Sequence, residues 1–152
     1  MSVVARLEEG ALCPDRELAA LLAQAKGDGA IVSFTGIARP GSKSGEAIYH
    51  LVLEHHPALT LQSLEEIAVE AAARFHVSHV HVVHRCGDIA AGEPIVFAGA
   101  ASMHRRAAFE AADYLMDRLK TEAVFWKREV GEAGSQWIEP TDADYADRER
   151  WG

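Results

Sequence analysis

The chain has 152 residues, of which 49% are hydrophobic and 25% charged, and its formal net charge at pH 7 is −8. This length and composition suit one globular domain that buries roughly 68–70% of the surface of its unfolded form. The acidic charge argues against nucleic acid as the main partner, because binding to a phosphate backbone requires a broad basic surface. A small anionic substrate is still allowed, since cations can cluster locally on an acidic protein.

The sequence also bears on location and redox state. It contains no run of about 18 apolar residues, so we expect no membrane span. Its beginning, MSVVARLEEGALCPDRE, lacks the basic start and long apolar core of a signal peptide, which favours a cytoplasmic protein. Cys13 and Cys86 belong to no CxxC pair. We therefore expect reduced thiols, with neither a disulfide framework nor a zinc site.

The first half of the chain predicts two helices and two strands. An early proline followed by acidic residues and apolar periodicity predicts a helix over 14–26. The nearly continuous apolar run at 29–35 predicts a strand covered on both faces. A loop rich in glycine and serine follows at 36–45, and alternation predicts the next strand over 46–56. Helical periodicity predicts the second helix within 57–75.

The second half predicts four strands and one long helix. The strands are rich in β-branched or alternating residues and are expected over 78–86, 94–102, 125–130 and 136–139. Gly87-Asp88 is expected to be a turn. Apolar residues at helical spacing predict a helix that opens at His104 and closes near Lys120. The polar tail, 141–152, is expected to be loosely held except where Trp151 finds a pocket.

This order of elements predicts the fold class. Strand pairs separated by single helices indicate an α+β fold, with helices laid on a largely antiparallel sheet. No internal repeat or long linker divides the chain, so residues 1–152 are expected to form a single domain. The hairpin near the C-terminal end could form a small β-subdomain.

Cations stand at both ends of the long helix and on the strand that follows it. His104 and Arg105 open the helix, Lys120 closes it, and Lys127 lies on the strand. A lysine in apolar surroundings beside other cations should have a lowered pKa and could act as a nucleophile or proton-transfer group. These cations could converge on one anionic ligand. In the alternative interpretation, His104 and Arg105 are simply solvated at the helix start. Lys120 then needs no function, because the helix dipole favours a cation at the C-terminal end.

Two further sequence patterns resemble binding sites. The loop at 36–45 approaches the phosphate-loop pattern GxxxxGK[ST], but Ser42 intrudes before the lysine and a strand follows where a helix is needed. A solvated turn that presents Arg39 is the simpler interpretation. His79 and His81 share one strand face and His84 the other, so they cannot chelate one metal together, and no HExxH motif occurs. We expect no metal site among these histidines.

Five motifs follow one another in register between about residues 29 and 139. They are F-x-G-x-x-R from Phe34, LEH-x-P from Leu53, HR-x-G from His84, HR-x-x-AF from His104, and LK followed by FWK-x-E from Lys120. Together they resemble the large, catalytic subunit of molybdopterin synthase. The resemblance implies an α/β hammerhead fold with an added antiparallel β-subdomain, and an enzyme that needs neither a metal nor a redox cofactor.

The resemblance also implies a reaction and its partners. A homodimer of large subunits binds two small ubiquitin-like sulfur-carrier subunits, which makes a heterotetramer. Each carrier's C-terminal thiocarboxylate passes sulfur to cyclic pyranopterin monophosphate, and two transfers form the dithiolene of molybdopterin. The matching positions imply that Lys120 and Lys127 are catalytic. The substrate-binding residues that it implies are Ile37, Ala38, Arg39, His104, Arg105, Arg128 and Glu129.

Three departures from the family pattern leave alternatives open. Pro40 follows the loop arginine where the family usually has asparagine, and Val124 replaces a common proline. Pro140 and Thr141 stand where the family can carry an arginine. One alternative is a non-catalytic dimeric module that docks the sulfur carrier. Another is an anion-binding enzyme such as a cyclic phosphodiesterase, although the metal ligands or paired histidine motifs usual in such hydrolases are missing.

Overall fold

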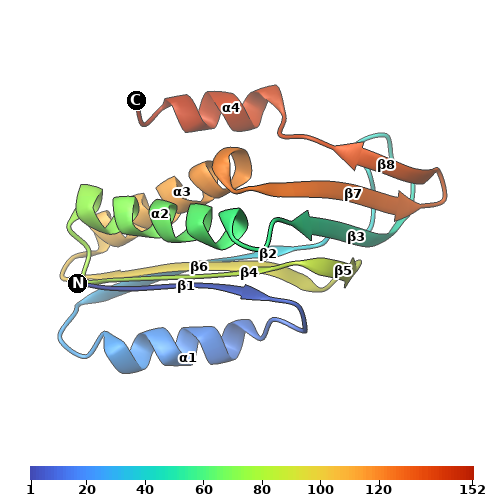
Figure 1. The fold of residues 1–152 in the computed structure, drawn as a ribbon. Helices are drawn as coiled ribbons and strands as arrows, with labels where there is room; N and C mark the ends of the chain where they lie inside the picture. Colours follow the sequence, from blue (N-terminus) through green and yellow to red (C-terminus); the bar gives the residue numbers. More distant parts are fainter.

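The apolar and β-branched segments form two four-stranded sheets in the computed structural model, which describes residues 1–152 (Figure 1). The first sheet has the order β1 (Ser2–Glu8), β4 (His79–Arg85), β6 (Pro94–Ser102) and β2 (Ala30–Ile37). Only β1 and β4 run parallel, and the other pairs are antiparallel. The central strands β4 and β6 are almost wholly buried, as their continuous apolar sequences predict.

Helices cover both faces of the first sheet. The helix α1 (Pro14–Gln24) packs on one face, while α2 (Leu59–Phe75) and α3 (Arg105–Glu122) pack on the other (Figure 1). The main core lies between the sheet and the second pair of helices. Small residues on the sheet, such as Ala98 and Ala100, meet larger ones such as Leu64 and Leu115. None of the helices is both long and apolar enough to cross a membrane.

The second sheet extends beyond one end of the first. Its order is β5 (Gly87–Ala90), β3 (Ile48–His55), β7 (Phe125–Gly131) and β8 (Gly134–Ile138), and all pairs are antiparallel. Figure 1 shows β7 and β8 projecting past α3, with β3 beside them. The C-terminal hairpin is thus part of a larger sheet, because β7 also pairs with β3.

The tail folds as a helix, α4 (Asp142–Glu149), that packs against α3 (Figure 1). A capping box starts it: the Thr141 hydroxyl accepts from the Asp144 N–H, and the Asp144 carboxylate accepts from the Thr141 N–H. Trp151, just after α4, packs edge-to-face on Phe75 and Tyr114. A polar segment is therefore tied down at both ends.

The mixed fold with helices on a largely antiparallel sheet is confirmed, with four corrections. Gly87 does have a positive φ of 88°, but the segment it opens is a strand, so the predicted turn at Gly87-Asp88 is wrong. The strand β1 and the helix α4 were not predicted. The helix α3 also continues through Thr121 and Glu122, for which the sequence predicts a short connecting segment.

Candidate active site

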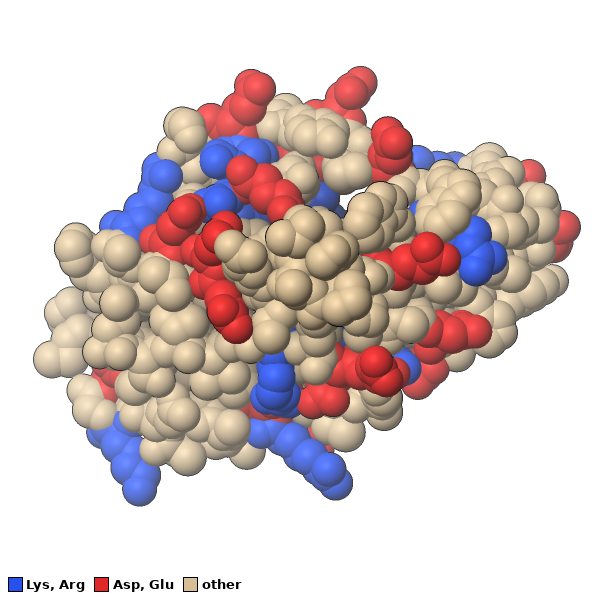
Figure 2. Space-filling model, viewed as in Figure 1, with Lys and Arg blue, Asp and Glu red and all other residues tan.

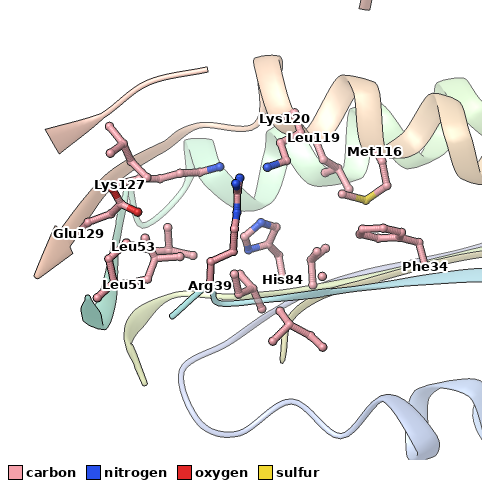
Figure 3. A pocket seen from close by; sticks show the side chains of 16 residues that line it. Phe34, Arg39, Leu51, Leu53, His84, Met116, Leu119, Lys120, Lys127 and Glu129 are labelled. Atoms are coloured by element: carbon pink, nitrogen blue, oxygen red, sulfur yellow. The ribbon is translucent and has the colours of Figure 1, made fainter. Parts of the chain in front are cut away.

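A cavity of about 320 Å³ lies where the two sheets meet the C-terminal end of α3. It is lined by sixteen residues, ten of them hydrophobic, contributed by β2, β3, β4, β6, α3, β7, β8 and the loop after β2. This volume lies within the range of small-molecule sites, which are mostly apolar with a few placed polar groups. Figure 3 shows the side-chain nitrogens of Arg39, Lys120 and Lys127 in the upper part of the cavity, with Leu51 and Leu53 at its lower left and Leu119 and Met116 beside Lys120.

Three cations converge on this cavity. The side-chain nitrogens of Arg39, Lys120 and Lys127 point toward one another across it (Figure 3). Elsewhere arginines such as Arg6 and Arg118 pair with carboxylates, whereas these three form no side-chain hydrogen bond or ion pair. Uncompensated cations gathered in one concave site favour an anionic ligand or a reaction in which negative charge develops.

The pairing of β3 with β7 sets which side chains enter the cavity. Leu53 lies opposite Lys127 and Leu51 opposite Glu129, and all four line the cavity. Because side chains alternate along a strand, Lys127 and Glu129 point the same way. The sequence analysis placed these two on one strand face, and the structure confirms that placement.

The same alternation directs Arg128 to the opposite face of β7. Its guanidinium donates to the Ser135 Oγ at 2.9 Å and lies 5.8 Å from the centre of the Trp137 ring. Ala38 is almost fully buried in a small core and is not among the lining residues. The structure therefore does not bring either residue into the cavity, although the resemblance implied both as substrate contacts.

A bulge at the end of β2 brings Ile37 and Arg39 to the cavity. The register between β2 and β6 shifts between Gly36 and Ile37. A Cβ added at Gly36 would lie 2.7 Å from the Val96 Cγ1, so any larger residue there would have to displace the Val96 side chain. Glycine thus fits where this strand turns toward the cavity without displacing Val96, and Arg39 follows two residues after the strand ends at Ile37.

The predicted helix residues separate into two groups. Lys120 stands in the last turn of α3 and lines the cavity, whereas His104 and Arg105 stand at its first turn. At 1.5 Å per residue, about 24 Å of helix separates the two ends. His104 and Arg105 instead line a shallow depression with Met103 and Arg106. A single chain does not bring these groups together.

Lys127 has a lowered pKa, as the sequence analysis predicted. Burial among apolar side chains, and then the charge of Lys120, lower the pKa of Lys127 to about 8. The Asp144 carboxylate opposes this shift. At pH 7 roughly one tenth of the Lys127 side chains is therefore an uncharged amine, which can accept a proton, and this fraction rises as the pH approaches 8.

His84 forms part of the cavity wall, a role that the sequence analysis did not assign. Its Nδ1 lies 2.8 Å from the Arg85 carbonyl oxygen, and its ring stacks on Phe125 with centroids 4.3 Å apart. Burial, and then the charges of Lys127 and Lys120, lower the pKa of His84 to about 4. The ring is neutral at pH 7, and when Nδ1–H donates to the carbonyl, Nε2 can accept a hydrogen bond.

A second, polar cavity of about 270 Å³ adjoins the first. The two share Arg39, Lys120 and Lys127, so these cations stand between an apolar and a polar compartment. The polar compartment is bounded by the loop containing Lys43 and by the start of α4. Burial raises the pKa of Asp144, but hydrogen bonds with Thr141 and the charges of both lysines outweigh it and hold that pKa below its usual range.

The remaining histidines of β4 have structural surroundings. His81 Nε2 lies 3.2 Å from the Glu17 Oε1 on α1, and His79 Nε2 lies 3.8 Å from the Asp28 carboxylate. Both are directed away from the cavity that His84 lines, so the predicted division of these histidines between two strand faces is confirmed. On the protein face seen in Figure 2, acidic and basic side chains are interspersed, without one broad basic area.

Comparison with known proteins identifies related sequences and structures. The family model described as "MoaE protein" matches residues 7–122. The molybdopterin synthase catalytic subunit of Pseudomonas aeruginosa is 43% identical over 146 residues, which cover 96% of this chain and 97% of the relative. That of Caulobacter vibrioides is 50% identical over 123 residues, covering 81% and 80%. A molybdopterin biosynthesis MoaE protein from Burkholderia ambifaria has a TM-score of 0.82 at 35% identity, covering 100% of this chain and 99% of that one.

Proposed function

Because the chain belongs to the MoaE protein family, we propose that it is the catalytic subunit of a molybdopterin synthase. In this function it transfers sulfur from the C-terminal thiocarboxylate of a small ubiquitin-like carrier to cyclic pyranopterin monophosphate, forming the dithiolene. The observation that carries the proposal is the convergence of Arg39, Lys120 and Lys127, unpaired, on one cavity. The reaction brings an anionic thiocarboxylate tail and a phosphate-bearing substrate into one site, and cations there can bind both anions.

Lys120 and Lys127 take different parts in this proposal. The amine of Lys127, with a pKa of about 8, accepts or returns a proton during transfer. The Lys120 ammonium stabilises negative charge that develops on the thiocarboxylate carbonyl or on the substrate. If the neutral amine of Lys127 is the working form, the rate of transfer falls as the pH drops below about 8.

The two compartments suit the two reactants. The polar compartment offers Lys43 and the hydroxyl groups of Ser42 and Ser44 near Arg39, a donor set suited to the cyclic phosphate. The apolar compartment has aliphatic walls, which exclude water from the reacting sulfur. Glu129 borders both compartments and can orient the donor groups of the pterin.

A second copy of the chain supplies His104 and Arg105 in this proposal. The family resemblance implies that both contact the substrate, but each stands about 24 Å of helix away from Lys120 in its own chain. They can contact the same substrate only if the start of one α3 reaches the cavity of another copy. We therefore assign the protein to a homodimer in which each pocket is shared, with one carrier bound per pocket, acting in the cytoplasm.

Reconstitution tests the proposed function against the non-catalytic alternative. The wild-type protein is mixed with a thiocarboxylated carrier and cyclic pyranopterin monophosphate, and the dithiolene product is assayed as its fluorescent oxidised derivative. Carrier binding is measured separately by calorimetry. We expect both binding and product. Binding without product would identify a docking module, in which Pro40 and Thr141 have removed the chemistry. Absence of both would overturn the proposal.

A further inference from the structure

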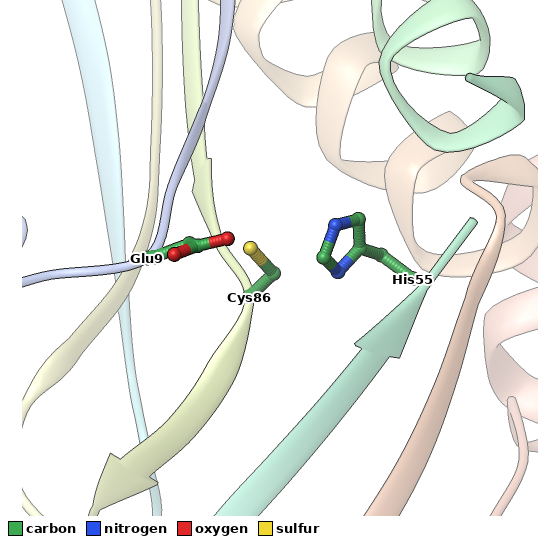
Figure 4. A group of neighbouring side chains, drawn as sticks. All are labelled: Glu9, His55 and Cys86. Atoms are coloured by element: carbon green, nitrogen blue, oxygen red, sulfur yellow. The ribbon is translucent and has the colours of Figure 1, made fainter. Parts of the chain in front are cut away.

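Three donor groups that the proposed sulfur transfer does not use meet at the junction of the two sheets. They are the carboxylate of Glu9, the imidazole of His55 and the thiol of Cys86. One potential ligand atom from each lies within 4.8 Å of the others. Figure 4 shows the carboxylate and the ring directed toward the sulfur from opposite sides.

The topology explains how residues so far apart in sequence meet. β1 and β4 run parallel up to their last residues, so Glu9 emerges beside Cys86. β5 begins directly after Cys86 and pairs with the end of β3, which carries His55. Glu9 directly follows β1, Cys86 stands between β4 and β5, and His55 ends β3, so the group joins both sheets.

Neither outer group has another partner in the protein. The Glu9 carboxylate and the His55 ring form no hydrogen bond or ion pair, and the Cys86 thiol has only a contact of 3.8 Å with the Glu8 carbonyl oxygen. A solvent-open depression lies over the group, and Glu54 and Asp88 also border it. There is consequently space for an ion and a water molecule beside three polar groups that have no strong partner.

The donor set favours one class of ligand. A thiolate and a carboxylate together neutralise the charge of a divalent cation, and a neutral imidazole supplies a third ligand. This combination of sulfur, nitrogen and oxygen ligands is typical of zinc. Magnesium and calcium are disfavoured here, because they prefer oxygen ligands to a sulfur ligand. Activation of Cys86 as a nucleophile is the competing interpretation, but an activated thiol needs electropositive surroundings, and Cys86 is buried beside a carboxylate.

Although the sequence predicts no zinc site from its two cysteines, we propose that Glu9, His55 and Cys86 bind one zinc ion, with water in the fourth position. Zinc–ligand distances of about 2.0–2.3 Å place the ligand atoms roughly 3.3–3.6 Å from one another. The three ligand atoms, now within 4.8 Å of one another, must therefore move closer by about 1 Å. Glu9 is exposed and His55 half-buried, which leaves both side chains free to move. The ion joins the end of β1 to both sheets and stabilises their junction, independently of sulfur transfer.

Cobalt substitution tests the site on the full-length protein. After treatment with a chelator, the protein is titrated with Co²⁺, and the thiolate-to-cobalt charge-transfer band is followed in the near ultraviolet. We expect one cobalt per chain, displaced by Zn²⁺. The Cys86→Ser variant should lose the band, and the matched control Cys13→Ser should keep it. Glu9→Gln and His55→Gln should each weaken zinc binding by at least about tenfold.

A second measurement covers the case in which Cys86→Ser, at a buried position, does not fold. Zn²⁺ should raise the Tm of the wild type and of Cys13→Ser by the same amount, and should raise that of Glu9→Gln and His55→Gln much less. Glu65→Gln, on the exposed side of α2, controls for the loss of a surface carboxylate. The site does not exist if the wild type shows no thiolate band, or if Glu9→Gln and His55→Gln bind zinc as tightly as the wild type.

Discussion

The chemistry assigned to Lys127 depends on its neighbour Lys120. Replacing Lys120 with Met removes one of the two causes that lower the pKa of Lys127, so this pKa should rise from about 8 toward its ordinary value. Lys120→Arg keeps the charge and should leave the pKa low. NMR titration of isotopically methylated lysines measures both variants. If Lys127 has the same pKa in the Met variant and the wild type, burial alone lowers that pKa.

His84 makes the stability of the protein sensitive to acid. Its pKa is about 4 in the folded state and about 6.5 when unfolded, so the unfolded chain takes up the proton first as the pH falls. Stability is therefore lost between about pH 6.5 and 4, by roughly 3 kcal/mol from this group. His84→Gln should weaken that dependence in urea unfolding series across this pH range. His50→Gln, at an exposed histidine, should keep it, and identical slopes in all three proteins would contradict the assignment.

Individual side chains were predictable where the cause is local in sequence. The lowered pKa of Lys127 follows from its apolar neighbours and nearby cations, which the sequence displays. The place of His84 in the cavity wall, and the meeting of Glu9, His55 and Cys86, depend on which strands pair and in what register. No spacing along the chain encodes those contacts.

The elements themselves were mostly predictable from periodicity, and those that were missed have physical reasons. β5 is only four residues long and opens with a glycine at positive φ, so it looks like a turn until its pairing with β3 is known. α4 has no buried residue, and its sequence therefore lacks an apolar stripe. The capping box at Thr141 and the anchor at Trp151 stabilise it from outside the helix, and Arg148 pairs with Glu122 of α3.

Trp151 should accordingly control the stability of the C-terminal end. It packs on two aromatic rings, and its Nε1 donates to the Asp117 carboxylate at 2.7 Å. Trp151→Ala should cost about 2–3 kcal/mol, less than the roughly 3–5 kcal/mol of a fully buried tryptophan, because Trp151 is only half-buried. Tyr145→Ala, at an exposed position on α4, is the control and should cost far less. Chemical denaturation compares the two, and equal losses would refute this anchor.

The division of the site between two copies is a property of the assembly. Lys120→Ala and His104→Ala variants should each be inactive alone. If copies exchange at random, half of the dimers in an equal mixture contain one intact pocket. The mixture should then recover about one quarter of the wild-type activity. Activity no higher than the sum of the separate variants, with exchange verified by mass spectrometry, would place all substrate contacts within one chain.

The net charge of −8 gives no sign of a cationic site, because a sum over 152 residues conceals the local arrangement. Several arginines pair with carboxylates, whereas the fold directs three unpaired cations, Arg39, Lys120 and Lys127, into one cavity. The five motifs of the sequence identified the family, and the fold shows which of their residues share a pocket.

The most direct test of sulfur transfer at this cavity compares three lysine variants in the reconstituted assay. Lys120→Ala and Lys127→Ala should each lower the rate of dithiolene formation by at least about 100-fold while binding the carrier normally. Lys26→Ala, at an exposed position just after α1, should match the wild type. Wild-type rates in both cavity variants would contradict the assignment, because the convergence of these cations would then have no part in the reaction.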